Sequence, residues 1–209
     1  MQNAQSAGAD GVVGGFTVAI LPNFLTAILQ GDYDFRVFGG FATQISTQVI
    51  GQLLAEQLGT PLTAEKLRNA QVGPFTTRYH WNQYDNPIND SFVDTYANAY
   101  GVVPDLFSSG TFTAASAIVQ AVEESGSTDV GGIADALSGM TVMDTPKGEG
   151  GYSFQSYNNQ ARSAMTIANP VPNEEQAWDA PIMPSSPLAT IPGEETTIPQ
   201  DASEMNCSL

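Results

Sequence analysis

The chain has 209 residues, 42% of them apolar, which is enough for one sizeable globular domain or two small ones. Its 22 acidic residues face only 6 basic ones, and the net charge is -16. This balance excludes the basic face that nucleic acid or an anionic membrane surface requires. An acidic chain with only two lysines indicates a high-salt source, and a merely acidic protein is the alternative.

Cysteine and histidine each occur once, as Cys207 and His80. A disulfide within the chain and a multi-histidine metal site are therefore excluded, and we expect no cofactor. Residues 1–8 lack the basic and apolar regions of a signal peptide. The longest apolar stretch, residues 12–29, is too interrupted by polar residues and glycines to cross a bilayer, so we expect a soluble chain that does not insert into a membrane.

The first 80 residues alternate between strand and helix patterns. Strands are expected at 10–16 and 35–38, helices at about 22–31 and 43–58, and an extended segment at 71–81. Both short strands end in a pair of glycines. This order is typical of βαβ units on a parallel sheet with flanking helices, an α/β fold.

The next 90 residues are mainly helical. A helix capped by Asn89 or Asp90 runs to residue 99, and others are expected at 111–125 and 131–137. Alternating patterns at 150–154 and 163–167 predict two strands. Residues 170–209 hold 7 of the 13 prolines and 7 acids without a base, so we expect a loosely packed or disordered acidic tail, with Trp178, Ile182 and Met183 tethering its first half.

No residue pattern carries catalysis. His80 stands between two aromatic residues without a nucleophile motif, so a structural histidine or one at the edge of a pocket is expected rather than a catalytic one. The paired acids are typical of solvated surface. The glycine pairs 14–15 and 39–40 do not match a nucleotide-binding fingerprint, but they suit the carboxyl edge of a parallel sheet, where ligands bind. Phe16 and Phe41 follow these pairs, each as a pocket wall or as a cap on the local core.

The order of several segments resembles the leucine/isoleucine/valine-type solute-binding proteins of ABC importers. The likeness covers roughly residues 8–170, and it rests on Gly11-Val12-Val13-Gly14-Gly15-Phe16, Phe38-Gly39-Gly40-Phe41, Phe92-Val93-Asp94-Thr95-Tyr96, Gly110-Thr111-Phe112-Thr113-Ala114-Ala115 and Ile133-Ala134-Asp135-Ala136-Leu137.

The resemblance implies a partial periplasmic-binding-protein type I fold with parts of two lobes. Residues 1–169 would form a partial leucine-binding-protein-like domain, in which 1–80 and 150–169 belong to the C-terminal lobe and 85–145 are helices of the N-terminal lobe. The segment from Tyr79 to Asp85 would be a hinge crossing. The family's first half has no counterpart here, so the chain resembles a C-terminal portion, with the signal sequence expected ahead of the missing lobe.

The resemblance also implies ligand-binding residues. Phe16 matches an aromatic residue that lines the cleft, whereas Phe41 falls where binders of α-amino acids often have an acid that holds the ammonium group. Phenylalanine offers only a cation–π contact there, which leaves amides, aromatic acids and other small organic solutes open. Tyr79 and Trp81 are further candidates for the cleft wall, and Phe112 is expected in the core instead.

The function implied is that of a non-enzymatic solute-binding component of an ABC importer. Its partners would be a small-molecule solute and the permease subunits, and the full-length protein would be extracellular or bound to the cell surface. One alternative is an intracellular ligand-sensing module of the same fold that controls a regulatory partner. Another is an unrelated α/β enzyme.

Overall fold

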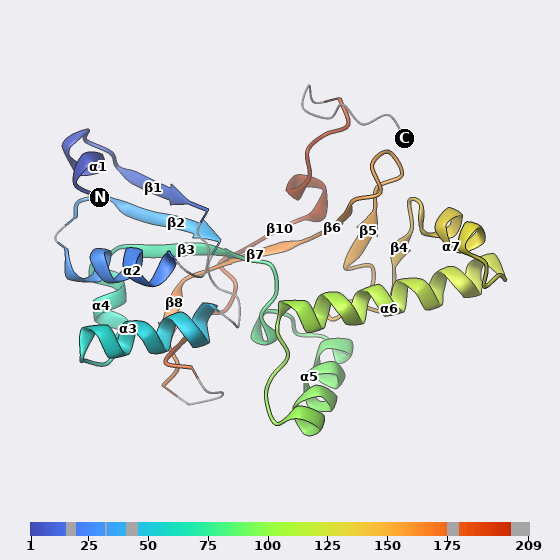
Figure 1. Cartoon of the computed structure of the whole chain (residues 1–209), viewed down its shortest axis with the longest axis horizontal. Coiled ribbons are helices and arrows are strands. Elements are labelled where there is room, and N and C mark those ends of the chain that lie inside the picture. Colours follow the sequence, from blue (N-terminus) through green and yellow to red (C-terminus); the bar gives the residue numbers. More distant parts are fainter. Residues whose placement is uncertain (16–19, 32, 41–45, 175–179, 202–209) are drawn as a thin grey trace. The chain divides into compact units, whose positions relative to one another are not determined.

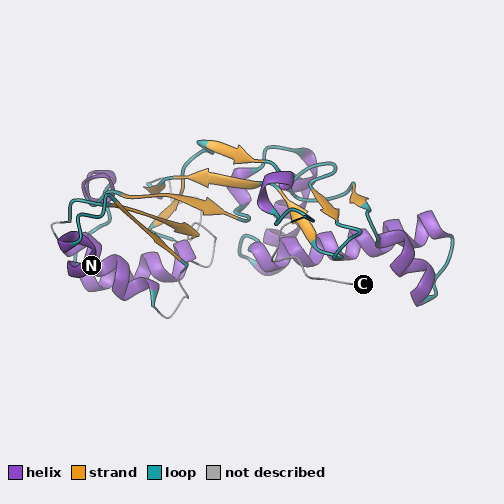
Figure 2. Ribbon diagram, turned by 90° about the horizontal axis from the view of Figure 1, so that it is seen from above, coloured by secondary structure: helices purple, strands orange, loops and turns teal. Residues whose placement is uncertain are grey.

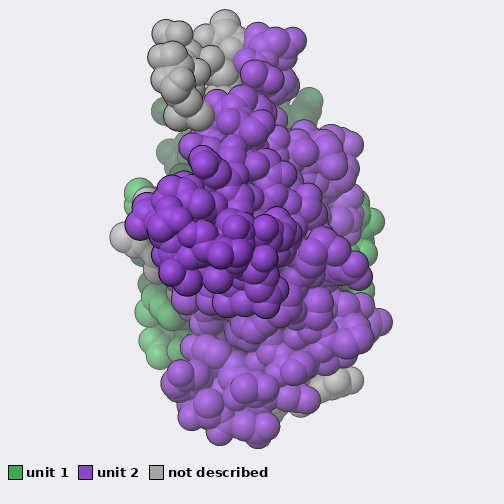
Figure 3. All heavy atoms as spheres, turned by 90° about the vertical axis from the view of Figure 1, so that its right-hand side faces the viewer, with its two compact units in different colours: residues 1–83, 166–189 green, residues 84–165, 190–209 purple. Residues whose placement is uncertain are grey.

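A computed structural model describes residues 1–15, 20–31, 33–40, 46–174 and 180–201, although the side chains of Ser46 and Ile50 are not described. The chain divides into two compact units, which are coloured separately in Figure 3. Unit 1 comprises residues 1–83 and 166–189, and unit 2 comprises residues 84–165 and 190–209.

Unit 1 is built on parallel strands. After the short helix α1 (Gln2–Ser6), strands β1 (Gly11–Gly14), β2 (Arg36–Gly40) and β3 (Val72–Thr77) pair in parallel. Strand β7 (Met165–Ala168), which apart from its first residue belongs to unit 1, pairs antiparallel with β3. The sheet order β1-β2-β3-β7-β10 ends with β10 (Ala189–Ile191), of which only Ala189 is counted in unit 1. The expected βαβ arrangement is therefore confirmed.

Helices lie along one face of this sheet (Figures 1 and 2). They are α2 (Leu21–Gln30), α3 (Gly51–Leu58), which follows a π-helical turn (Ser46–Ile50), and α4 (Ala64–Asn69), a short helix that the sequence analysis missed. The core between helices and strands consists of buried apolar side chains: Leu21, Leu25, Ile28, Phe35, Val37, Leu54, Leu62, Leu67, Val72, Phe75 and Ile182. On the opposite face of β1, Val13 is 81% exposed.

The described part of unit 2 contains three α-helices and a small antiparallel sheet. The helices are α5 (Pro87–Tyr100), α6 (Leu106–Ser125) and α7 (Val130–Leu137), and strands β4 (Thr141–Val142), β5 (Tyr152–Phe154) and β6 (Ala161–Ser163) form the sheet. Ala117 and Ala121 of α6 pack with Met140 and Val142 in a core of small extent. The 3-10 turn Gly193–Thr196 also belongs to this unit, where Thr196 Oγ1 donates to the Ser163 carbonyl at 3.0 Å.

Both long helices begin earlier than expected. Asn86 caps α5 by accepting from the amide of Asn89 at 3.0 Å, and Pro87 occupies the first turn, where its missing N–H costs nothing. The predicted cap at Asn89 or Asp90 is therefore wrong. Helix α6 begins at Leu106 because the Asp105 carboxylate accepts from the amides of Phe107 and Ser108 at 2.9 and 2.8 Å.

The acidic tail is better packed than expected where it is described. Strands β8 (Pro170–Pro172) and β9 (Ile182–Pro184) pair antiparallel in unit 1, and Ile182 lies in the core with 1% of its side chain exposed. The expected tether at Ile182 is thus confirmed, whereas a loose extension over these residues is wrong. Trp178 lies outside the described residues.

Lys147 joins three segments of unit 2. Its ammonium group donates to Ser163 Oγ at 2.8 Å and to the Ala164 carbonyl at 2.7 Å, and it lies 4.9 Å from the ring centre of Tyr152. The centre of the Tyr84 ring lies 5.6 Å from the same ammonium nitrogen. Burial raises the pKa of the Tyr84 hydroxyl well above its usual value. The lysine is therefore a structural cation between two aromatic rings.

Candidate functional site

The carboxyl ends of three parallel strands meet at one edge of unit 1. Strand β1 ends at Gly14, β2 at Gly40 and β3 at Thr77, and Gly39 and Gly40 of β2 face Phe75 and Thr76 of β3. Thr76 Oγ1 lies 3.5 Å from the Gly39 carbonyl oxygen. In open α/β sheets, ligands bind outside this edge, so the edge is the candidate ligand site.

The glycine at position 39 is required by the backbone itself. Its φ of 157° is rarely adopted by other residues, and a Cβ there would lie 2.4 Å from the Gly14 carbonyl oxygen. At Gly40 a Cβ would meet only Thr76 Oγ1, at 3.5 Å. The pair therefore allows β1 and β2 to approach closely while the last residue of β2 stays open to the edge.

The predicted ligand contacts are only partly described. Phe16 and Phe41 lie outside the described residues, in the segments that follow β1 and β2. Tyr79 follows β3 and is 1% exposed, whereas Trp81 begins a 3-10 turn and is half-buried. Their role as walls of a ligand site stays a prediction.

His80 lies between these two aromatic residues and is fully buried. Burial lowers the pKa of its imidazole from 6.5 to about 3, although a hydrogen bond with Asn82 acts in the opposite direction. The ring of Trp81 lies 5.8 Å from the imidazole, centre to centre. A neutral imidazole packed in this way fits the structural role that the sequence predicted.

The segment after His80 is fixed to the tail. Asn82 Nδ2 donates to the Pro184 carbonyl at 3.0 Å, and Gln83 Nε2 donates to the Ser185 carbonyl at 2.8 Å. These bonds fasten the last residues before unit 2 to the end of β9 and to the residue that follows it, all within unit 1.

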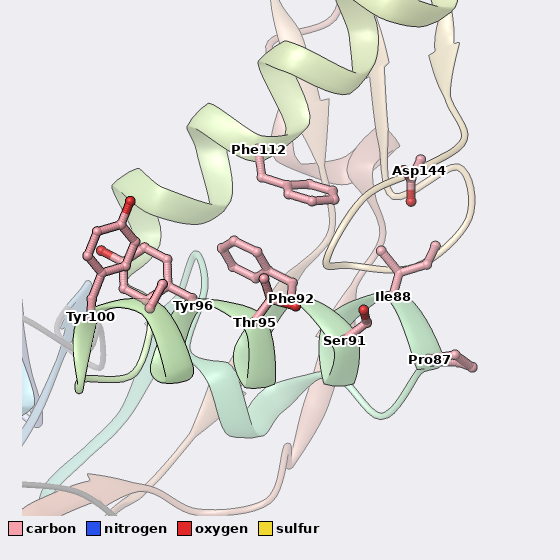
Figure 4. Close-up of a pocket in the computed structure, with 10 residues that line it drawn as sticks. Pro87, Ile88, Ser91, Phe92, Thr95, Tyr96, Tyr100, Phe112 and Asp144 are labelled. Atoms are coloured by element: carbon pink, nitrogen blue, oxygen red, sulfur yellow. The ribbon is translucent and has the colours of Figure 1, made fainter.

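Unit 2 carries a second candidate feature, a cavity of about 590 Å³ along helix α5 (Figure 4). We call it the aromatic pocket, because it is lined by Phe92, Tyr96, Tyr100 and Phe112, with Asp144 at its margin. The rings of Phe92 and Phe112 lie 5.0 Å apart, and those of Tyr96 and Tyr100 lie 4.6 Å apart. Phe112 is half-buried and lines this pocket, whereas the sequence analysis expected it in the core.

A second cavity, with a mixed apolar and acidic lining, adjoins the aromatic pocket along α6. This cavity of about 670 Å³ shares Phe112 and Asp144 with the aromatic pocket, and Val119 and Met143 also line it. Val119 is 58% exposed and Met143 is 44% exposed. The exposed Val119 and Met143 share this cavity with the carboxylates of Glu123, Glu124 and Asp144.

No group of three or more histidine, cysteine or acidic side chains in the described ranges is arranged to hold a metal ion. None of the helices in the same ranges combines the length and the apolar character that a membrane-spanning segment needs.

Comparison with solved structures gives the fold. The branched-chain amino acid ABC transporter periplasmic ligand-binding protein from Burkholderia xenovorans LB400 matches with a TM-score of 0.69 and 18% identity, over 93% of this chain and 47% of that one. The amino acid ABC transporter substrate-binding protein from Pseudomonas fluorescens Pf-5 matches with 0.68 and 18%, over 100% and 50%. A solute-binding protein of an ABC transporter from R. palustris, solved in complex with benzoate, matches with 0.57 and 16%, over 100% and 49%.

The chain therefore spans about half the length of these structures. Its mixed α/β architecture matches the type I periplasmic-binding-protein fold over a partial chain, which confirms the expected fold class. The sequences of functionally curated proteins contain no match. A family model described as periplasmic binding protein matches residues 1–175, and the chain belongs to that family.

Proposed function

We propose that this chain is the C-terminal portion of a solute-binding component of an ABC importer. The observation that carries the proposal is the edge at which Gly14, Gly40 and Thr77 end three parallel strands, because ligands of open α/β sheets bind at this edge. The family assignment and the substrate-binding proteins among the similar structures support it. The role is binding and presentation of a solute, without catalysis.

The proposed ligand contacts are Phe16, Phe41, Tyr79 and Trp81. Phe16 and Phe41 follow β1 and β2 in the sequence, and Tyr79 and Trp81 follow β3, so all four come directly after strands that end at the candidate edge. The solute is an amino acid, an amide or a similar small organic molecule. Because Phe41 supplies no negative charge for an ammonium group, aromatic acids belong in the same group of candidates.

The lobe assignment is part of the same proposal. From the resemblance, residues 1–80 and 150–169 belong to the C-terminal lobe, and residues 85–145 contribute helices to the N-terminal lobe. The division into units differs for residues 150–165, which lie in unit 2 with helices α5–α7. We therefore assign only residues 1–80 and 166–169 to the C-terminal lobe. The aromatic pocket and the exposed Val119 support a further part of the protein packing on α5 and α6, since amphipathic helices normally bury such side chains. The complete protein acts outside the cytoplasmic membrane or at the cell surface, where it delivers the solute to permease subunits.

Solute binding by the product of the complete open reading frame tests the proposal. Titration calorimetry with leucine, glutamine, acetamide and benzoate should find saturable binding for one of these solute classes. Phe16→Ala and Trp81→Ala should each weaken that binding by about tenfold, the loss expected when about 1.4 kcal/mol of contact is removed.

Phe107→Ala is the matched control, because Phe107 is an equally aromatic residue that lies on α6 of unit 2, is 66% exposed and is not among the proposed ligand contacts. It should leave the affinity unchanged. If no solute class binds to the complete product, or if Phe16→Ala and Trp81→Ala leave the affinity as it is, the proposed function is wrong.

A further inference from the structure

Unit 1 contains a cavity of about 420 Å³ at the edge of the sheet opposite to the candidate ligand site. Arg36, the first residue of β2, and Gln71, which directly precedes β3, lie on its wall. Helix α4 adds Leu67 and Arg68, and the start of β8 adds Val171, with Asn169 just before it. We call this cavity the arginine pocket.

The charge of the arginine pocket opposes that of the chain. The sequence has 22 acids and 6 bases, yet two of the bases line this cavity, and no acid among the described residues does. Within the described ranges, neither Arg36 nor Arg68 forms an ion pair with a carboxylate. Both side chains are exposed, so a ligand from solution reaches them.

The wall of the arginine pocket is held by regular structure. Thr63 caps α4 by accepting from the amide of Lys66 at 3.2 Å, which fixes the helix that carries Arg68. Gln71 has a left-handed φ of 51°, and its amide donates to the Arg68 carbonyl at 3.0 Å. Its own carbonyl accepts from the amide of Val37, next to Arg36, at 3.1 Å. The two arginines therefore stand on elements joined by backbone hydrogen bonds.

The chemistry of the lining selects the ligand class. Guanidinium groups bind carboxylates through parallel, charge-assisted hydrogen bonds, and the amides of Gln71 and Asn169 offer further donors. Leu67 and Val171 supply an apolar wall. The volume of about 420 Å³ lies within the usual range for small-molecule sites. From these features we propose that the arginine pocket binds a small organic anion, a carboxylate on an apolar body.

This second site is separate from the solute site and does not depend on the proposed function. Its carboxylate is held by Arg36 and Arg68 at the amino ends of β2 and β3, whereas the solute site lies at their carboxyl ends. A test must therefore report where in unit 1 a carboxylate binds.

Amide chemical shifts of the ¹⁵N-labelled 209-residue chain give that position. Titration with sodium butyrate should shift the amides of Gly73 and Val171 in a saturable way, at millimolar concentration, while sodium chloride at equal ionic strength should not. Inorganic phosphate is the second probe, and it should bind less tightly than butyrate because it lacks an apolar body. Shifts at Gly15 and Gly40 report the solute site separately, so either proposal can fail without the other.

Variants test the two guanidinium groups. Arg36→Gln and Arg68→Gln should each raise the dissociation constant for butyrate about tenfold, as expected for the loss of a charge-assisted hydrogen bond. Arg68→Lys, which keeps the charge but not the planar fork, should give an intermediate loss. The matched control is Lys66→Gln, because Lys66 lies on the same helix and outside the lining of the cavity.

The proposal is overturned if the shifts at Gly73 and Val171 grow linearly without saturation, or if chloride reproduces them. Equal weakening by Lys66→Gln and Arg68→Gln also overturns it, because the effect would then be one of general charge. Tighter binding of phosphate than of butyrate would remove the assignment to an organic carboxylate.

Discussion

At the scale of single residues, His80 makes the stability of the folded chain depend on pH. Burial lowers the pKa of its imidazole from 6.5 to about 3, so between these pH values the unfolded chain binds a proton that the folded chain does not. The resulting stabilisation is complete above pH 6.5 and is lost as the pH falls toward 3. We expect the free energy of unfolding to be about 1.4 kcal/mol lower at pH 5.5 than at pH 8 from this residue alone.

Urea unfolding at the two pH values measures this difference. His80→Gln removes the titrating group while keeping a side chain that can hydrogen-bond, so the difference should largely disappear in the variant. Because His80 is the only histidine in the sequence, its imidazole signals also report its protonation directly. An imidazole that titrates near pH 6.5 in the folded chain would show that this prediction is wrong.

The sequence predicts the role of some single residues but not the spatial position of others. That His80 is structural follows from its aromatic neighbours and the lack of a nucleophile motif. The meeting of Arg36 and Arg68 at one cavity could not be foreseen, because the two residues are 32 positions apart and belong to a strand start and a short helix. Only the register between β2 and β3 and the packing of α4 bring them together.

At the scale of elements, the close approach of strands β1 and β2 at their glycine-containing ends can be tested by substitution. Gly39→Ala should lower the free energy of unfolding by about 2 kcal/mol, because the new Cβ would meet the Gly14 carbonyl oxygen and the φ of 157° disfavours any other residue. Urea denaturation followed by circular dichroism measures the change.

Gly15→Ala serves as the comparison, since a Cβ at Gly15 meets nothing within 4 Å and its φ lies outside the left-handed region. It should change the free energy of unfolding by at most about 0.5 kcal/mol. Similar losses of unfolding free energy in both variants would mean that the close approach of β1 and β2 does not explain the effect of Gly39→Ala.

The elements themselves were predictable where periodicity is long and local. Helices α2 and α7 lie close to their expected ranges, because their apolar spacing repeats within one segment. The start of α5 was misplaced because Asn86-Pro87 also fits a turn, and the pair acts as a cap only when helix follows. Strands β8 and β9 have three residues each and carry prolines, so their pairing depends on contacts that no local pattern contains.

At the scale of the whole chain, the sequence order was enough to give the fold class, but not the way apolar surface is distributed. Among the described residues, unit 1 buries eleven apolar residues in one cluster, whereas the cluster in unit 2 has four. The described helices of unit 2 instead leave Ile118, Val119 and Val130 more than half exposed. The packing partner of a helix face cannot be inferred from the face alone, so the aromatic pocket had no signal in the sequence beyond its ring-bearing residues.

Net charge sets how stable this arrangement is in different solutions. With 22 acids against 6 bases, the folded chain concentrates negative charge that the unfolded chain spreads out, and salt screens this repulsion. We expect the melting temperature to rise by roughly 4 °C or more between 0.05 M and 2 M potassium chloride, which for a chain of this size corresponds to about 1–2 kcal/mol.

Thermal unfolding followed by circular dichroism at several salt concentrations measures this rise. Most of it should occur below about 0.5 M, where the screening length changes most, if repulsion between carboxylates is the cause. A further rise toward 2 M would indicate a contribution beyond screening, namely the strengthening by salt of the apolar burial that accompanies folding. A melting temperature that stays constant over the whole range would show that the acidic surface does not limit the stability of this chain.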